Sequence, residues 1–120
     1  MARFNRRVTN RLTRPFARLL PGFGVVEHVG RRSGRRHETP VNVFRHDGAY
    51  VIALTYGRES EWVRNVLARD GCDLVMRGRR RTLRAPTVVH DENRRLVPRP
   101  LRPILAALRV ADFLRLEEAA

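Results

Sequence analysis

The sequence predicts a mainly β (α+β) fold, a small antiparallel barrel of five or six strands with helices near both ends and one inserted helix. Short segments rich in apolar and β-branched residues are joined by hairpin turn signals, and only a few stretches have helical periodicity. The 120 residues, 42% of them hydrophobic, are enough for one packed core. We therefore expect a single domain, with an amphipathic helical segment over residues 1–20 and the barrel over residues 21–120.

The N-terminal segment predicts a basic amphipathic helix over residues 4–20. Phe4, Val8 and Leu12 recur every four residues with arginines between them. Pro15 either kinks this helix or starts a second one. The apolar side either covers the core of the domain or lies on a membrane surface.

The strands are expected in four segments. Two of them are hairpins, one turning at Asp47-Gly48 and the other at Gly78. In the first hairpin, the apolar run from Tyr50 to Leu54 indicates a buried strand. The four segments span residues 25–30, 39–57, 72–90 and 111–118.

The inserted helix is expected over residues 60–70. Ser60 is a suitable N-cap, Glu61 favours the positive N-terminal end, and Gly71 is a natural C′ stop. Apolar pairs one turn apart, Trp62 with Val66 and Val63 with Leu67, predict that it packs inward. A later helix is expected to open at Pro103, with its apolar residues inside the protein; these residues are Ile104, Leu105 and Leu108.

The charge predicts an anionic partner. The chain has 25 basic residues, all of them arginine, against 12 acids, and a formal net charge of +13. Arginine binds phosphate and carboxylate groups in a bidentate manner, so nucleic acid, an acidic cofactor and an anionic lipid surface are the candidates. Cys72 is the single cysteine, which excludes an internal disulfide and fits a reducing cytoplasm. No apolar run has the length of a membrane span, and the N-terminus lacks a signal-peptide pattern.

Several kinds of chemistry have little support. The four histidines have neither i, i+4 spacing nor a cysteine at ligand spacing, which argues against a metal site. No nucleophile elbow is present, and the Rossmann and Walker glycine patterns are absent.

Two stretches predict a ligand site. The first is the turn from Gly30 to Gly34, where glycines bring backbone N–H groups close to a ligand and arginine and serine add donors. This turn could equally be a solvated hairpin tip. The second is residues 54–65, where a strand ends and a helix N-terminus follows near Ser60. Such a helix start can hold an acidic or electron-rich ring.

These two stretches also carry a family resemblance. The segments "GRRSGRRHETPVNVFRHDGAYVIALTYG" and "EWVRNVLARDGC" resemble the deazaflavin-dependent nitroreductase family, which includes quinone reductases that use coenzyme F420. The paired motifs are Gly-Arg-x-Ser/Thr-Gly and Trp-x-x-Asn, and the similarity covers roughly residues 21–90. The resemblance implies a split β-barrel, FMN-binding-like fold. It also implies hydride transfer from reduced F420 to a small quinone, nitro or enone acceptor.

The resemblance further implies a set of site residues. The turn that grips the cofactor's phosphate and acidic tail corresponds to Arg31, Arg32, Ser33 and Gly34. The strand that continues along the cofactor corresponds to His37, Glu38, Thr39, Pro40, Val41 and Asn42. The strand end beside the ring corresponds to Leu54, Thr55, Tyr56 and Gly57, and Tyr56 is the expected catalytic hydrogen-bond donor. The helix start that closes over the ring corresponds to Glu61, Trp62, Val63, Arg64 and Asn65.

The chain departs from this family pattern at two positions. Gly57 stands where many relatives have a basic residue, which Arg58 or Arg64 could replace. Val63 stands where many have tyrosine, which Tyr56 could replace. FMN is therefore kept as a less favoured cofactor, and a role as a cofactor carrier stays open.

Three further expectations concern partners and location. A basic nucleic-acid-binding protein is the main alternative function, but the chain lacks clustered surface aromatics and a clear helix-turn-helix or zinc finger. Residues 4–20 could hold the protein at the inner face of the cell membrane, and otherwise we expect it in the cytoplasm. A homodimer is possible, since split barrels of this kind often pair to complete their sites.

Overall fold

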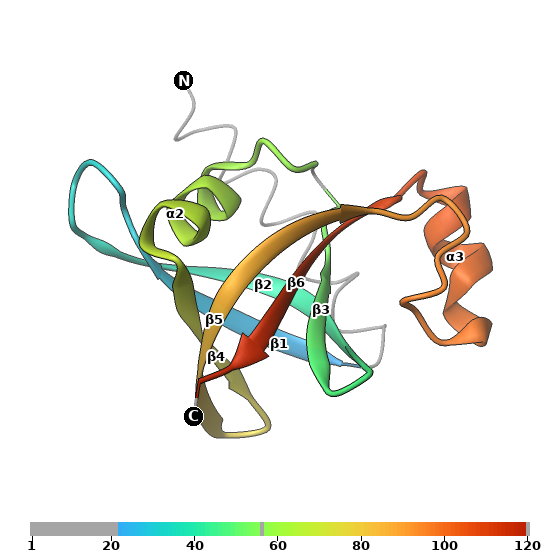
Figure 1. The fold of residues 1–120 in the computed structure, drawn as a ribbon, viewed down its shortest axis with the longest axis horizontal. Coiled ribbons are helices and arrows are strands. Elements are labelled where there is room, and N and C mark those ends of the chain that lie inside the picture. Colours follow the sequence, from blue (N-terminus) through green and yellow to red (C-terminus); the bar gives the residue numbers. More distant parts are fainter. Residues whose placement is uncertain (1–21, 56, 120) are drawn as a thin grey trace.

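The predicted antiparallel barrel is confirmed in a computed structural model, which describes residues 22–55 and 57–119. Within this part of the chain, six strands close a barrel in the order β1-β2-β3-β6-β5-β4, and every neighbouring pair is antiparallel. The helix over Glu61–Arg69 (α2) lies across one end of the barrel, and the helix over Arg102–Ala107 (α3) lies outside its wall (Figure 1). The elements are β1 (Phe23–Val29), β2 (Arg36–His46), β3 (Ala49–Ala53), α2 (Glu61–Arg69), β4 (Gly71–Met76), β5 (Arg79–His90), η1 (Arg99–Leu101), α3 (Arg102–Ala107) and β6 (Asp112–Glu118). The predicted helix over residues 4–20 and the predicted donor Tyr56 lie outside the described residues.

Both predicted hairpin turns are confirmed. Asp47 and Gly48 join β2 to β3 with φ angles of 51° and 79°, and Arg77 and Gly78 join β4 to β5 with φ angles of 51° and 75°. Two successive residues with positive φ are the mark of a type I′ turn, whose twist matches that of the flanking strands. These tight turns fix the register of both hairpins.

A bulge in β5 lets the sheet curve into a barrel. The pairing of β5 with β6 shifts between Arg84 and Thr87, where Ala85 has a φ of 54°. Pro86 occupies the same irregularity, as expected of a residue that cannot donate to the ladder. A bulge bends its strand and increases the local twist, and β5 follows a long curve through Figure 1.

The interior of the barrel is filled by alternate residues of the strands. Along β3, Tyr50 and Ile52 point inward and are almost completely buried. Two residues of α2, Val63 and Val66, are fully buried in the same cluster and close that end of the barrel. The other buried members are Val26, Val41, Val43, Leu54, Leu74, Leu83, Leu114 and Leu116. Burial of apolar surface on this scale is the main force that holds the fold together.

A second apolar layer lies on the outside of the barrel. Val51 and Ala53 alternate with the inward residues of β3 and pack against α3 through Leu105. The remaining buried members are Phe44, Val97, Val110 and Phe113. Because both faces of β3 are covered, the strand is one continuous apolar run, as its sequence predicted.

Three side chains predicted to be inside are exposed. Ile104 and Leu108 of the α3 segment are 39% and 46% exposed, although Leu105 between them is buried. A helix of only six residues that lies on a sheet can bury one stripe, and Leu105 occupies it. Leu67 of α2 is 41% exposed, because Val63 and Val66 take the inward positions of that helix.

The predicted stop of α2 is displaced by one residue. Asp70, with a φ of 56°, takes the left-handed position at the end of the helix that was predicted for Gly71. Gly71 begins β4, where a Cβ atom would lie 2.5 Å from the carbonyl oxygen of Leu83. Glycine is therefore required there by close strand packing rather than by its φ.

None of the helices in residues 22–55 and 57–119 has both the length and the apolar character needed to cross a bilayer.

Candidate functional site

The first predicted stretch forms a compact turn between β1 and β2. The N–H of Gly30 donates to the carbonyl oxygen of Arg35 at 2.8 Å, and the N–H of Gly34 donates to that of Gly30 at 3.0 Å. Gly34 has a φ of 71°, while a Cβ on Gly30 would lie 2.4 Å from the Ser33 hydroxyl oxygen. Gly34 is thus needed for the backbone conformation of the turn, whereas a side chain at position 30 would require the Ser33 hydroxyl to move.

Arg31 ties this turn to the start of α2. Its Nη1 donates to the Glu61 carboxylate at 2.7 Å and to the Asn65 side-chain oxygen at 2.8 Å. Its backbone N–H donates to the same Asn65 oxygen at 3.1 Å. The two predicted stretches are therefore joined in one place by residues that lie 30 and 34 positions apart in the chain.

Asn65 continues this connection into the barrel. Its side-chain nitrogen lies 3.1 Å from Nδ1 of His28, and Nε2 of His28 lies 3.1 Å from the Thr39 hydroxyl. His28 and Asn65 are only 3% and 4% exposed. The His37 ring stacks on the His28 ring, with centroids 5.5 Å apart. A chain of hydrogen bonds thus runs from β2 through β1 and α2 to the turn.

The second predicted stretch forms a tight connection from β3 to α2. The N–H of Leu54 donates to the carbonyl oxygen of Asp112 on β6 at 3.0 Å, which fixes the strand end. Gly57 follows with a φ of 90°, and its N–H donates to the carbonyl oxygen of Leu54 at 3.1 Å. Ser60 is the N-cap residue of α2, and its hydroxyl donates to the carbonyl oxygen of Gly57 at 3.0 Å. Because Ser60 bonds backward, it holds the loop rather than a helix N–H.

The predicted site residues differ in what they present to a ligand. Arg32, Ser33, Gly34, Glu38 and Arg64 are exposed, whereas Arg31, His37, Thr39, Pro40, Thr55, Gly57, Glu61 and Trp62 are half-buried. Trp62 packs against the barrel core. The buried members are Val41, Asn42, Leu54, Val63 and Asn65. Val41, Leu54 and Val63 belong to the core, so any contribution of their side chains comes through the shape of the site wall.

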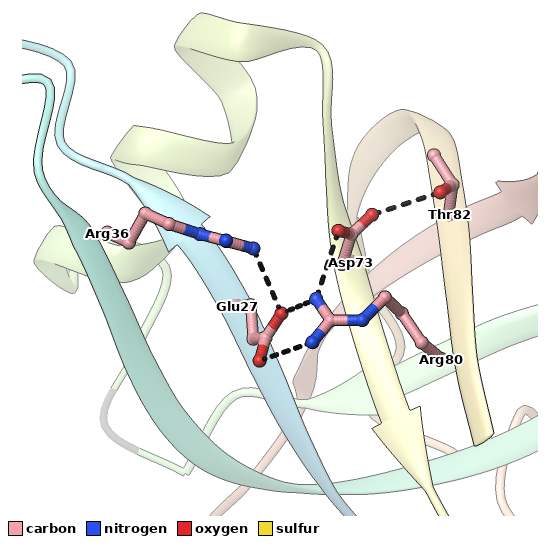
Figure 2. A network of polar contacts seen from close by, with 5 residues as sticks. All are labelled: Glu27, Arg36, Asp73, Arg80 and Thr82. Carbon is pink, nitrogen blue, oxygen red and sulfur yellow. Dashed lines mark hydrogen bonds and ion pairs between the residues drawn. The ribbon is translucent and has the colours of Figure 1, made fainter.

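A separate polar network covers the outer face of β1, β4 and β5 and reaches the start of β2 (Figure 2). Arg80 binds Glu27 through both of its terminal nitrogens and reaches Asp73 at 3.5 Å. Arg36 donates to Glu27 at 3.2 Å, and Thr82 donates to Asp73 at 3.0 Å. These contacts join neighbouring strands on the solvent side, and none of them reaches the turn or α2.

Comparison with known proteins identifies the family. The model of the F420H(2)-dependent quinone reductases matches residues 1–107. The chain belongs to this family. The prediction of an F420-dependent oxidoreductase is therefore confirmed, with coenzyme F420 as its cofactor.

Solved structures with low sequence identity share the fold of this quinone reductase family member. One, described as a domain-swapped dimer, is 16% identical with a TM-score of 0.59, and the match covers 96% of this chain and 95% of that one. An F420-H2-dependent reductase (FDR-A) is 15% identical over 81% of this chain and 95% of its own, with a TM-score of 0.53. General stress protein 26 from Bacillus anthracis str. Sterne is 14% identical over 86% of this chain and 83% of its own, with a TM-score of 0.54. Comparison with curated proteins gives no significant match.

The residues at the turn fit the anionic part of F420. The cofactor carries a phosphodiester and a glutamate tail, and the turn offers the exposed guanidinium groups of Arg32 and Arg35. The Ser33 hydroxyl is also exposed, although it accepts a bond from the N–H of Arg35 at 3.2 Å. Nothing lies within 4 Å of the position that a Cβ on Gly34 would take, so a ligand can approach the backbone there.

His28 belongs to the hydrogen-bonded chain that includes Asn65, but the sequence did not mark it as a site residue. A single histidine in an apolar strand has no motif to mark it. The available signal was its position two residues after Val26, which the alternation of the strand turns toward the interior. A polar residue at an inward position needs a partner, and here the partner is Asn65 of the Trp-x-x-Asn motif.

Proposed function

We propose that this protein transfers a hydride from F420H2 to a small quinone-type acceptor. In this proposal the cofactor's phosphate and acidic tail bind at residues 30–35, and its ring lies beside residues 54–57 and the start of α2. The observation that carries the proposal is the set of bonds from Arg31 to Glu61 and Asn65, because they bring both family motifs to one edge of the barrel.

We assign binding of the cofactor's anionic groups to the exposed residues of the turn. Arg32 and Arg35 lie at the solvent side with flexible guanidinium groups, which suit a phosphodiester and carboxylates that are themselves exposed. Ser33 and the backbone around Gly34 add short donors. The net charge of +13 attracts a polyanion from a distance.

We assign binding of the cofactor's ring to the loop after β3 and to the start of α2. The bonds of Gly57 to Leu54 and of Ser60 to Gly57 fix both ends of this loop, which favours a defined orientation of a bound ring. Trp62, packed on the core, gives an apolar wall that excludes water. When bound, the reduced deazaflavin supplies a hydride, and a quinone that takes up this hydride and a proton becomes a hydroquinone. We assign the proton, or a hydrogen bond to the acceptor oxygen, to the hydroxyl of Tyr56.

A titration with F420 and FMN side by side tests cofactor binding. We expect F420 to bind more tightly, and Arg32→Ala to weaken its binding by about 1–3 kcal/mol through loss of a charge-assisted bond. Arg79→Ala, on the exposed start of β5, is the matched control for a general loss of positive charge. Equal affinities of both variants for F420 would remove Arg32 from the site.

A turnover assay tests the acceptor class. The absorbance of reduced F420 should be lost when a quinone is added with the protein, and the rates with a nitroaromatic and an enone define the specificity. If F420 binds but no acceptor is reduced, the protein is a cofactor carrier.

The surface around α3 supports a contact with an anionic membrane that could supply a lipophilic quinone. Ile104 and Leu108 are exposed one helical turn apart, and residues 93–111 contain five arginines and no acid. Apolar anchors in a segment rich in arginine match an anionic bilayer, at the inner face of the cell membrane. The predicted helix over residues 4–20 would add a second anchor.

Flotation with vesicles tests this contact. The full chain should float with anionic vesicles and not with neutral ones, and the double variant Ile104→Ser/Leu108→Ser should float less. Leu67→Ser is the matched control, since Leu67 is equally exposed on α2 but lies away from this surface. Full flotation of the double variant, or a change in its oligomeric state alone, would reject the lipid contact at α3.

A homodimer is the last part of the proposal. The related fold described as a domain-swapped dimer makes self-association of such barrels plausible on structural grounds. Light scattering of the purified protein, with and without F420, measures the mass directly, and a monomer under both conditions would reject it.

A further inference from the structure

We propose that Asn65 and His28 are positioning residues, which hold the 30–35 turn in its cofactor-binding shape and do so only while His28 is neutral and protonated on Nε2. This inference rests on the proposed function in one respect, namely that the turn binds the cofactor. The contacts that carry it lie within the chain and can be tested without any ligand.

The orientation of the Asn65 amide follows from Arg31. The backbone N–H and Nη1 of Arg31 are both donors, and both lie within 3.1 Å of the Asn65 atom assigned as oxygen. Only the carbonyl oxygen of an amide can accept these bonds, so the amide nitrogen must face the other way. It lies 3.1 Å from Nδ1 of His28.

The orientation of the amide in turn selects the histidine tautomer. Because the Asn65 nitrogen donates, Nδ1 of His28 must be an acceptor and carries no proton. A neutral ring then has its proton on Nε2, which donates to the Thr39 hydroxyl at 3.1 Å. The sequence of donors therefore runs from Arg31 to Asn65, from Asn65 to His28, and from His28 to Thr39.

Protonation of His28 would break this order. An imidazolium is a donor at both nitrogens, so Nδ1–H would face the N–H groups of the amide. Rotating the amide would only move the conflict, because its nitrogen would then face the two donors of Arg31. At acid pH the turn therefore loses its contact with Asn65 of α2 and keeps only the ion pair of Arg31 with Glu61.

Three neighbours of the His28 ring within the described residues carry no negative charge that would stabilise an imidazolium. They are Asn65, Thr39 and His37, whose ring stacks on that of His28. His28 also lines a cavity of about 340 Å³ whose acids and arginines are equal in number. The charged and titratable groups of this cavity are Glu27, Asp70, Asp73, Arg36, Arg69, Arg84 and Cys72. Beyond Asn65, Glu61 is paired with Arg31.

This arrangement also assigns different roles to the two adjacent arginines. Arg31 is half-buried and uses Nη1 and its backbone N–H inside the protein, so it positions the turn. Arg32 is exposed on the same turn and is free to meet the cofactor from the solvent side. Loss of Arg32 should weaken cofactor binding without loosening the turn.

The ring nitrogens of His28 give the first test. At about pH 7.5, ¹⁵N chemical shifts of the imidazole in the free wild-type protein should show an unprotonated Nδ1 and a protonated Nε2. An Nδ1–H tautomer or an imidazolium at that pH overturns the proposal. No variant is needed, so a folding defect cannot obscure the result.

Hydrogen exchange gives the second test, with the amide of Arg31 as the reporter because it donates directly to Asn65. After correction for intrinsic rates, its protection in the free protein should fall by about tenfold or more between about pH 7.5 and about pH 5. The buried amide of Ile52 in β3 is the control for global unfolding. Unchanged protection of Arg31 over this range overturns the pH dependence.

The variant Asn65→Asp separates this proposal from a merely structural role. A carboxylate can accept from Arg31 and from Nδ1–H of His28 at once, so this variant should shift His28 to the Nδ1–H tautomer or the imidazolium. The acid loss of Arg31 protection should then disappear or reverse. Retention of the wild-type tautomer and pH dependence overturns the proposal.

Titration with F420 distinguishes failure of the positioning contact from failure of the proposed function. If the proposal holds, wild-type affinity for F420 should fall at acid pH in parallel with Arg31 protection, whereas Arg32→Ala should lower affinity and leave protection unchanged. If neither the wild-type protein nor Arg32→Ala binds F420, and the tautomer and exchange results hold, the proposed function fails and the positioning contact stands. If F420 binds equally at both values of pH despite loss of protection, the turn does not need this contact, and the inference fails.

Discussion

Glu27 and His28 are neighbours on β1, yet they belong to two different kinds of polar structure. Glu27 points outward and binds Arg80 and Arg36 in a network of full charges at the surface (Figure 2). His28 points inward and forms hydrogen bonds with the uncharged side chains of Asn65 and Thr39. The alternation of a β-strand is the whole cause of this difference, since it turns successive side chains to opposite faces.

The same contrast is repeated on β4. Asp73 is the register partner of Glu27 and joins the outer network, whereas its neighbour Cys72 packs against the barrel core. On both strands charged groups are kept where water screens them, and groups that can be neutral are placed inside. Substitutions that remove inner contacts should therefore have large effects that do not depend on salt concentration. Substitutions that remove outer contacts should have small effects that disappear at high salt.

The largest effect is expected on the reactivity of the Cys72 thiol, which packs against the barrel core. Burial, followed by the nearby Asp73 charge, raises the pKa of Cys72 from 9.0 to about 12. A rise of this size lowers the thiolate fraction by about a thousandfold near neutral pH. Alkylation by iodoacetamide, followed by mass spectrometry, should be slower in the folded protein than in denaturant by a factor on the order of a thousand. Similar rates in both states would show that the inner face is open to solvent and charge.

The next effect is expected from Asn65→Ala. It removes three hydrogen bonds and leaves the Arg31 N–H and Nδ1 of His28 without this partner in a buried place. We expect the free energy of unfolding to fall by about 2–4 kcal/mol in urea titrations, with the same loss at low and high salt. Arg64→Ala, an exposed change on the same helix, is the control and should stay within about 0.5 kcal/mol. A loss as small as the control's would show that the inner contacts do not stabilise the fold.

Local signals in the sequence were sufficient for much of the fold. Asp47-Gly48 and Arg77-Gly78 specify type I′ turns by their own backbone preferences, and the apolar run in β3 reports burial on both faces. These features depend on near neighbours in the chain, which is why the hairpins and α2 were predicted correctly. The family motifs predicted a common site for residues 30–34 and 61–65, and the structure places Arg31 in contact with Glu61 and Asn65.

The features that sequence reasoning missed depend on long-range partners. The bulge at Ala85 is set by closure of β5 onto β6, and Pro86 beside it was the one local signal in the sequence. Exposure of Ile104 and Leu108 follows from how α3 lies on the barrel, which its periodicity does not contain. The bonding of Arg31 inside the protein also required knowledge of where Asn65 lies, because an arginine in a glycine turn has the same appearance whether it binds a ligand or a helix.

A small effect is expected from Arg80→Ala on the outer face. It removes the bonds to Glu27 and Asp73, but these groups lie at the surface and keep other partners, Arg36 and Thr82. The free energy of unfolding in urea should fall by less than in Asn65→Ala, and the difference from wild type should vanish in about 1 M salt, where the Debye length is about 3 Å. A loss equal to that of Asn65→Ala, or one unaffected by salt, would contradict the distinction between the two faces.

The smallest effect is expected from His90→Gln, which compares an outer histidine with the inner His28. Hydrogen bonds to Asp112 at 2.7 Å and to Glu92 at 3.2 Å raise the pKa of His90 above its ordinary value of 6.5. A raised pKa means that the folded state binds the proton more tightly, so this contribution to stability is complete below pH 6.5 and is lost as the pH rises through the folded value. The contact of His28 with Asn65 has the opposite sign, because a proton breaks it. Melting temperatures measured across this range should therefore decline less steeply toward alkaline pH in His90→Gln than in wild type, while the loss of stability at acid pH remains. If the substitution instead removed the acid loss, the histidine that controls stability at low pH would be the outer one, and the neutral role assigned to His28 would be wrong.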